Sequence, residues 1–133
     1  MAQTFEDESF DLVITSDVFE HLPDVAPAVR EIMRTLKPGG AHVFTVPWFR
    51  SEKTLVRALV KDGVVQHLEK PDYHGNPVDK SGSLVFTEWG KELPFLLQEW
   101  GKFPVIIHAI RDRSLGIDGE FREVFVQQKP YDR

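Results

Sequence analysis

The segment FDLVITSDVFEHLPD at residues 10–24 limits the possible folds more than any other part of the sequence. Its first residues form a nearly continuous apolar run without polar alternation: Phe10, Leu12, Val13 and Ile14. This pattern is typical of a strand that is covered on both faces in a parallel sheet. Such a strand needs a neighbour on each side, yet only nine residues precede it. The sequence therefore predicts a sheet in which one neighbour of this strand is missing from the chain.

A helix and a second strand follow, in the order of a strand–helix–strand crossover. Asp24 is a candidate N-cap, and apolar side chains recur at helical spacing as far as Leu36. Pro38 and the pair Gly39–Gly40 predict the helix end, because proline cannot continue a helix and glycine closes one in the left-handed conformation. The run AHVFTV at 41–46 is the second buried strand. Crossovers of this kind are right-handed and parallel in nearly all proteins.

The middle of the chain is less regular. Ser51 can cap a short helix that ends at Gly63 and turns four apolar side chains inward: Leu55, Val56, Leu59 and Val60. The segment 63–86 then mixes Pro, Gly, Asp and Ser with two histidines. A loop of this length inside a compact domain is usually functional or disordered.

The last third of the chain predicts one helix and two closing strands. Thr87 can cap a helix that ends at Gly101. Pro94 removes a hydrogen bond inside that helix, so the helix is expected to kink there or to start near Leu93. The runs at 103–110 and 120–127 are strands, and the short link between them predicts antiparallel pairing.

The composition limits the class of partner. The 133 residues carry a formal net charge of −5, and no run of Lys or Arg is longer than two. This argues against a nucleic-acid partner but not against a neutral or cationic small substrate. Cysteine is absent, as is common in a reducing cytoplasm, and no apolar stretch approaches the roughly 18 residues of a membrane span. We expect a single, cytoplasmic, partial domain over residues 1–133 without a membrane partner.

Three motifs, SFDLVI, DVFEHL and LKPGG, stand here in the order found in class I S-adenosylmethionine-dependent methyltransferases. From Gln3 to Lys129 the chain resembles the second half of that fold. It is most similar to the small-molecule methyltransferases that carry an acidic-x-x-Glu-His-Leu element after the fourth strand. The resemblance implies an α/β, Rossmann-like fold in truncated form, with strands 4-5-7-6, an antiparallel last strand and two to three helices. It also implies S-adenosylmethionine as the cofactor.

The same resemblance implies what the chain lacks. Strands one to three of the family carry the glycine-rich turn for the methionine part of the cofactor and the acidic residue for its ribose. The segment 116–119 is no substitute, because it lies between the closing strands and is more simply a hairpin turn. Met1 stands about where the family has an Asp near the adenine, so the chain looks cut there. We expect this chain alone to bind the cofactor poorly and to be inactive.

By resemblance, two groups of residues would border the cofactor. Ser16, Asp17 and Val18 follow the carboxyl end of a parallel strand, where ligands of open α/β sheets bind, and would lie beside the methionyl group. Ala2 and Gln3 would lie beside the adenine. From the residues alone, Asp17 could equally cap a turn.

The segment 63–86 would cover the acceptor by resemblance. His74 is the candidate base for the acceptor's proton, and Tyr73 offers an aromatic face beside it. Trp48 follows the second strand and could line the substrate pocket or cover the sheet. His21 could be catalytic or could support the pocket wall. The other histidines are expected to serve packing or strand edges: His42, His67 and His108.

A weaker alternative is a metal site. The spacing acidic-x-x-Glu-His resembles that of small-RNA terminal 2'-O-methyltransferases, in which carboxylates and histidines hold a divalent metal over the RNA ribose. The corresponding donors here are Asp17, Glu20, His21 and His74. Oxygen and imidazole donors suit Mg or Mn. The acidic net charge argues against an RNA substrate.

Three functions therefore remain open. The chain is part of a methyltransferase for a small-molecule acceptor, a non-catalytic half-domain that acts as a binding or assembly module, or one of two chains that together form an enzyme. A bare strand edge and an uncovered sheet face both promote association. We therefore expect a homodimer formed through that edge or face.

Overall fold

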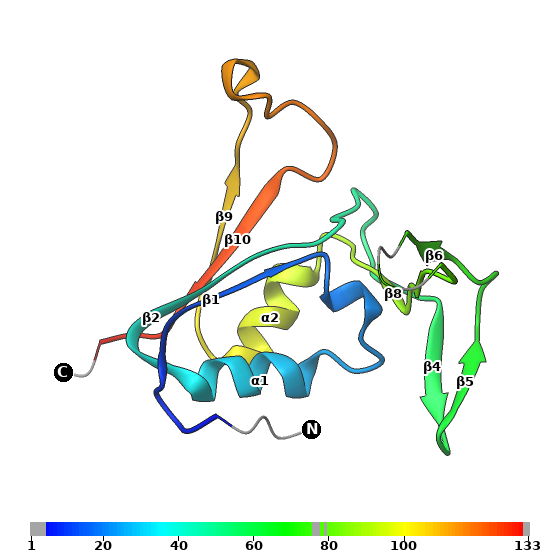
Figure 1. Ribbon diagram of the computed structural model, residues 1–133, viewed down its shortest axis with the longest axis horizontal. Coiled ribbons are helices and arrows are strands. Elements are labelled where there is room, and N and C mark those ends of the chain that lie inside the picture. Colours follow the sequence, from blue (N-terminus) through cyan, green and yellow to red (C-terminus); the bar gives the residue numbers. More distant parts are fainter. Residues whose placement is uncertain (1–4, 76–77, 79, 132–133) are drawn as a thin grey trace.

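The computed structural model describes residues 5–75, 78 and 80–131, and its centre is a four-stranded mixed sheet (Figure 1). The strands lie in the order β1 (Phe10–Ser16), β2 (Leu36–Thr45), β10 (Glu123–Gln128) and β9 (Val105–Ala109). β1 and β2 run parallel, whereas β10 is antiparallel to both β2 and β9. This is the predicted order 4-5-7-6 with an antiparallel last strand, so the α/β fold class is confirmed.

Two helices, α1 (Ala26–Thr35) and α2 (Leu93–Gly101), pack against one face of this sheet. Alternate side chains of β2 and β10 point toward them, as the period of two in a strand requires. The core contains Val29 from α1, Leu97 from α2, Phe44 from β2 and Phe125 from β10, each no more than 1% exposed. The rings of Phe44 and Phe125 stack with their centroids 5.2 Å apart. This packing fixes the two strands whose ends border the pocket described below.

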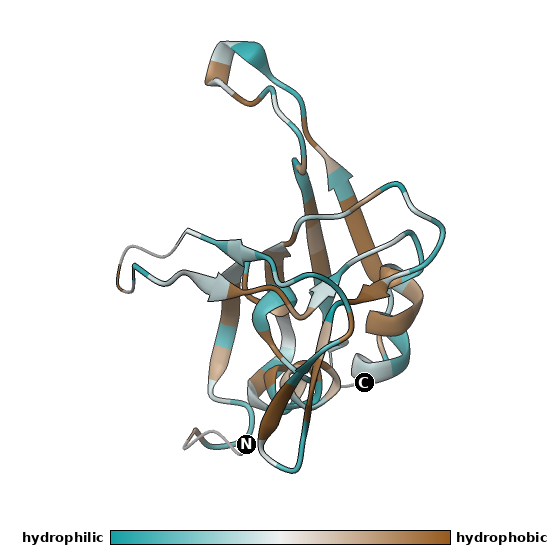
Figure 2. Cartoon of the chain, turned by 90° about the vertical axis from the view of Figure 1, so that its right-hand side faces the viewer, coloured by the Kyte–Doolittle hydropathy of each residue, from teal (hydrophilic) through white to brown (hydrophobic). Residues whose placement is uncertain are grey.

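The opposite face of the sheet is apolar and carries neither α1 nor α2. Across the four strands, the register aligns Ile14 with Val43, Val43 with Val126, and Val126 with Ile106. We call this row, together with Leu12, the open face. The side chain of Leu12 is 51% exposed and that of Ile14 is 68% exposed. Figure 2 shows hydrophobic colouring on these strands. In the described part of the chain, β1 pairs only with β2, as expected for a strand whose other neighbour is missing.

The predicted helix between Ser51 and Gly63 is wrong. The segment instead forms β3 (Leu55–Val56) and β4 (Ala58–Lys61), and β4 pairs with β5 (Val64–His67) as an antiparallel hairpin. The turn is Asp62–Gly63, and both residues have positive φ, 52° and 77°. Asp-Gly with two positive φ angles is the usual signal of a two-residue hairpin turn. The valines then favour strand over helix, because their branched side chains suit a pleated surface.

The segment expected to be a loop, 63–86, contains short strands. After β5 come β6 (Tyr73–His74) and β7 (Ser83–Leu84), which pair antiparallel, and then β8 (Thr87–Glu88), which pairs with β3. In Figure 1 the β4–β5 hairpin projects from one end of the molecule. Figure 2 shows that this hairpin is largely hydrophobic. Nothing in the described part of the chain is a helix long and apolar enough to cross a membrane.

The helix boundaries also differ from the predictions. The residue that caps α1 is Val25, although Asp24 still accepts a hydrogen bond from the Ala26 N–H at 3.2 Å. The helix ends at Thr35, before the glycines, because β2 already begins at Leu36. At the other helix, Thr87 lies in β8 and does not cap α2. The alternative start near Leu93 and the end at Gly101 are confirmed, and proline stands in the first turn, where the missing N–H costs nothing.

Candidate functional site

An open pocket of about 710 Å³ lies at the carboxyl ends of β1 and β2. Four segments contribute to its wall: the turn after β1, the end of β2, the β6–β7 pair and the link between β9 and β10. The lining residues include Asp17, His21, Thr45, His74 and Phe121. The volume is within the range of small-molecule sites, and the position is the one at which open α/β sheets bind ligands.

The turn after β1 places one carboxylate at the pocket. Asp17 has φ 50°, in the left-handed region that Asp tolerates better than most residues. Its N–H donates to the Thr45 carbonyl at 3.0 Å, and the hydroxyls of Ser16 and Thr45 lie 3.0 Å apart. These contacts join the ends of β1 and β2. Of the three cofactor residues predicted in this turn, Asp17 lines the pocket, whereas Val18 borders a separate hollow beside α1.

The next residues form a short 3-10 turn, η1 (Phe19–His21), that is tied to the segment after β7. The N–H of Phe86 donates to the Glu20 carbonyl at 2.8 Å. The Nδ1 atom of His21 lies 2.8 Å from the Leu84 carbonyl, which can only accept, so Nδ1 carries the proton. These two contacts fix both the backbone of Glu20 and the ring orientation of His21.

His74 reaches the same site from β6, where it pairs with Ser83. Gly82 permits this arrangement. It has φ 80°, and a Cβ atom at this position would lie 2.7 Å from the carbonyl oxygen of His74. The imidazole of His74 is partly exposed and faces the ring of His21 edge-on, with the ring centroids 5.0 Å apart.

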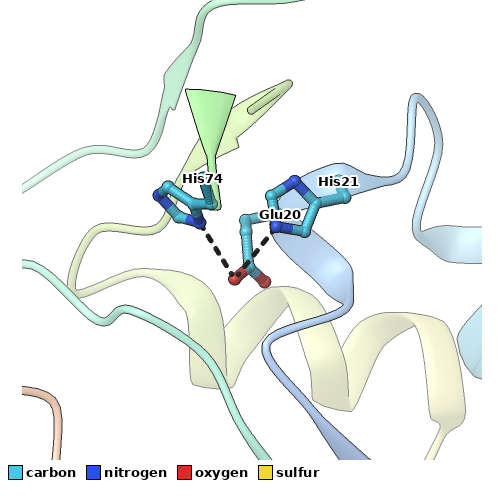
Figure 3. A group of neighbouring side chains, drawn as sticks. All are labelled: Glu20, His21 and His74. Atoms are coloured by element: carbon cyan, nitrogen blue, oxygen red, sulfur yellow. Dashed lines mark ion pairs between the residues drawn. The ribbon is translucent and has the colours of Figure 1, made fainter. Parts of the chain in front are cut away.

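The carboxylate of Glu20 lies beneath both imidazoles (Figure 3). The distance from its Oε1 atom is 3.7 Å to Nε2 of His21 and 3.8 Å to Nδ1 of His74. The residue is 1% exposed, and neither carboxylate oxygen has a hydrogen-bond partner among the described residues. Burial raises the pKa of Glu20 above its ordinary value. Ligand atoms of Glu20, His21 and His74 all lie within 4.8 Å of one another, so these three residues could hold a metal ion.

The structure places the other predicted site residues elsewhere. Trp48 donates its indole N–H to the Gly90 carbonyl at 2.8 Å and packs edge-on against Phe125. It borders a neighbouring hollow of about 350 Å³ and does not line the main pocket. Tyr73 is 52% exposed and is also not part of the pocket wall. Ala2 and Gln3 lie outside the described residues.

Two features of the site were not visible in the sequence pattern. One is the burial of Glu20, a residue whose pattern in the sequence indicated only a possible metal ligand. The other is the contribution of Thr45 and Phe121 to the pocket wall. Thr45 could have been found as the last residue of a parallel strand. Phe121 carries no such signal, because its position depends on the course of the β9–β10 link.

Comparisons with known proteins agree with this fold. Residues 1–44 match the family model described as methyltransferase domain. The chain is 32% identical over 96 residues to dimethylglycine N-methyltransferase of Parasynechococcus marenigrum (strain WH8102), covering 71% of this chain and 30% of that protein. It is 46% identical over 46 residues to the chloroplastic tocopherol O-methyltransferase of Arabidopsis thaliana, covering 35% of this chain and 13% of that one.

A solved structure extends the likeness over nearly the whole chain. An S-adenosylmethionine-dependent methyltransferase from Mesorhizobium loti superposes with a TM-score of 0.58 at 14% identity, covering 94% of this chain and 64% of that one. The chain therefore spans less than two thirds of each of these proteins. The fold is that of the Rossmann-like methyltransferases, and the chain belongs to the class I S-adenosylmethionine-dependent methyltransferase family.

The residues present fit one side of the family's cofactor, S-adenosylmethionine. Asp17 offers a carboxylate at the carboxyl end of β1, beside the hydroxyls of Ser16 and Thr45. The connection from β1 to α1, residues 17–25, contains no glycine. The close backbone approach that a glycine-rich turn allows is therefore not available there. The chain supplies a polar wall for the cofactor and not the turn that would enclose it.

Proposed function

We propose that this chain takes part in methyl transfer from S-adenosylmethionine to a small-molecule acceptor bound in the main pocket. The observation that carries the proposal is the convergence of Asp17, His21 and His74 on a pocket at the carboxyl ends of β1 and β2. The family membership supplies the reaction class, and the acidic net charge of −5 is compatible with a cationic or neutral acceptor.

Within this pocket we assign distinct roles to the polar side chains. The cofactor, when bound, supplies an electrophilic methyl group. Asp17 would face the positively charged methionyl part of the cofactor. The imidazole of His74 would accept the proton that an oxygen or nitrogen acceptor loses on methylation. His21, whose ring is fixed by the Leu84 carbonyl, would shape the wall behind the acceptor.

An acceptor panel tests this assignment. The relatives named above methylate dimethylglycine and tocopherol, so these two compounds are tried first, with methyl-labelled cofactor and protein at high concentration. Because the chain lacks the turn that would enclose the cofactor, we expect little product from the chain alone. Where labelled product forms, we expect His74→Gln to lower its rate by about 100-fold, the contribution typical of a general base. His67→Gln, on the exposed strand β5, is the matched control. A rate unchanged in His74→Gln would contradict the base role.

A second candidate function rests on the open face. A row of branched aliphatic side chains crosses four strands, next to an edge of β1 that pairs with no other strand among residues 5–75, 78 and 80–131. Monomeric proteins normally cover such a surface. We propose that a second copy of the chain covers it, in a two-fold contact that is self-complementary because the same row occurs on both copies. If labelled product is absent with every acceptor while the chain is dimeric, the assembly role is favoured over catalysis.

A further inference from the structure

We propose that Glu20, His21 and His74 bind a divalent first-row transition metal, for which Zn²⁺ is the probe. Three donor atoms converge beside the main pocket: a carboxylate oxygen of Glu20, Nε2 of His21 and Nδ1 of His74 (Figure 3). The two histidines line the pocket, and Glu20 lies buried behind them. Two imidazoles and one carboxylate form the ligand set of several catalytic metal sites, in which the remaining coordination positions stay open. Imidazole-rich sites suit transition metals better than Mg²⁺.

The distances between the donor atoms are close to those of a coordination site. Separations of 3.7 and 3.8 Å from Oε1 of Glu20 to the two ring nitrogens are too long for hydrogen bonds. Metal–ligand bonds of about 2.0–2.2 Å place two ligands of one ion roughly 3–3.5 Å apart. Small rotations of the side chains would bring the three donors to such distances. The cluster is therefore too open for a hydrogen-bonded network and close to the size of a coordination site.

The state of Glu20 is the second, independent observation. Its side chain is 1% exposed, it points between the two imidazoles, and both of its oxygens lack a hydrogen-bond partner among the described residues. A buried carboxylate whose oxygens accept no hydrogen bond is destabilising unless a cation compensates its charge. A divalent ion would supply that compensation directly.

The hydrogen bond of His21 fixes the tautomer that a metal requires. Nδ1 donates its proton to the Leu84 carbonyl at 2.8 Å, which leaves the lone pair of Nε2 directed toward Glu20. Metal-binding histidines almost always donate their other N–H to a carbonyl or carboxylate in this way. The surrounding structure thus already orients one ligand without any contribution from the ion.

The ion would also be accessible to an acceptor. His21 and His74 line the pocket together with Asp17, so the open coordination positions would face the same space. The role of the ion in catalysis rests on the proposed function, although metal binding does not. An acceptor hydroxyl on the metal would have a lowered pKa. With its lone pair on the metal, His74 would then be a ligand and would no longer serve as the base.

Zn²⁺ titration of the tag-free chain by calorimetry tests the site. We expect one ion per chain with a Kd below about 10 μM, a free energy near −7 kcal/mol. Glu20→Gln and His74→Gln should each weaken binding at least tenfold, whereas His67→Gln and His108→Gln, which remove exposed histidines from β5 and β9, should leave the Kd unchanged. Circular dichroism of each variant checks that it folds. Glu20→Gln retains the shape of the side chain and removes its buried charge.

The same samples separate this inference from the proposed function. Absence of Zn²⁺ binding, or loss of binding in His67→Gln or His108→Gln with Glu20→Gln unaffected, overturns the metal site. Titration of S-adenosylhomocysteine into the metal-free chain tests the cofactor independently. If labelled product forms, a chelator distinguishes the two roles of His74. The chelator should abolish product formation if the metal activates the acceptor, and it should leave product formation unchanged if His74 acts as the base.

Discussion

At the scale of single residues, Glu20 and His42 are both buried titratable groups, but they lie in different surroundings. Glu20 lies beneath two imidazoles beside the pocket, and its carboxylate has no hydrogen-bond partner among the described residues, whereas His42 lies in the core between β2 and the helices. His42 stacks on Phe44 with the ring centroids 4.4 Å apart, and its Nε2 atom lies 3.0 Å from the hydroxyl of Thr15. The sequence predicted a packing or edge role for His42, and its full burial confirms packing.

The burial of His42 predicts a pH dependence of stability. Burial lowers its pKa from 6.5 to about 4. The unfolded state therefore binds an additional proton between these values, so stability is complete above pH 6.5 and is lost as the pH falls toward 4. From the pKa difference we expect a loss of about 2 kcal/mol between pH 7 and pH 5.

Urea unfolding at pH 7 and pH 5 measures this loss, at fixed protein concentration because the chain is expected to associate. His42→Gln cannot titrate and retains a side chain of similar size, so it is the comparison variant. Its free energy of unfolding should change less between the two pH values than that of the wild type. Equal pH dependence in both proteins would show that His42 does not carry the effect.

At the scale of elements, the sequence predicted the main sheet well and the middle of the chain poorly. The strands could be recognised because their apolar runs and the crossover rule leave few arrangements. The prediction for the segment around Leu55 was wrong because its apolar residues fit both a helical and an extended period. The Asp62–Gly63 turn, which decided the outcome, was interpreted as a helix end. Local pattern alone does not distinguish these alternatives.

The candidate site was predictable only in part, for a related reason. Asp17, Glu20 and His21 are close in sequence, so their neighbourhood in space could be expected. His74 joins them only because hydrogen bonds link residues more than 60 positions apart in the sequence. These bonds join His21 to Leu84 and Phe86 to Glu20. No local pattern encodes such pairings, and their formation depends on the β6–β7 pair.

The β6–β7 pair should be sensitive to Gly82. Gly82→Ala adds a Cβ atom 2.7 Å from the His74 carbonyl at a φ of 80°. Gly116→Ala is the matched control, since its φ is 74° and no atom lies within 4 Å of the added carbon. Both variants carry the strain of a positive φ, about 1 kcal/mol. The steric overlap should lower the free energy of unfolding of Gly82→Ala by about 1 kcal/mol more than that of Gly116→Ala.

Hydrogen exchange reports this difference locally. The amides of residues 73–75 and 83–84 should exchange faster in Gly82→Ala than in Gly116→Ala, because weakened pairing exposes them. Identical exchange in the two variants would mean that Gly82 does not hold His74 in place. Urea unfolding of both variants gives the accompanying change in stability.

At the scale of the whole molecule, the helices that the structure describes cover the sheet on one face only. The open face and the β1 edge predict association of two copies, so light scattering should give a mass of about twice 15.3 kDa. Ile14→Lys places a charge in the middle of the open face, where the side chain is 68% exposed, and should yield a monomer. Leu115→Lys, at the far tip of the β9–β10 hairpin and 73% exposed, should leave the mass unchanged.

A monomeric wild type at high concentration would contradict the homodimer. An Ile14→Lys variant that remains dimeric would place the contact elsewhere on the molecule. Either result leaves the fold and the pocket unaffected, because the core lies on the other side of the sheet.

We infer that this chain retains a working part of a methyltransferase site, and titration of S-adenosylhomocysteine by calorimetry tests that claim. The mass in solution is measured on the same sample. We predict detectable but weak binding, because the turn that would enclose the cofactor is not available, and still weaker binding to Asp17→Asn, which loses the carboxylate at the pocket wall. No heat of binding up to millimolar ligand, in a sample of established mass, would contradict the claim.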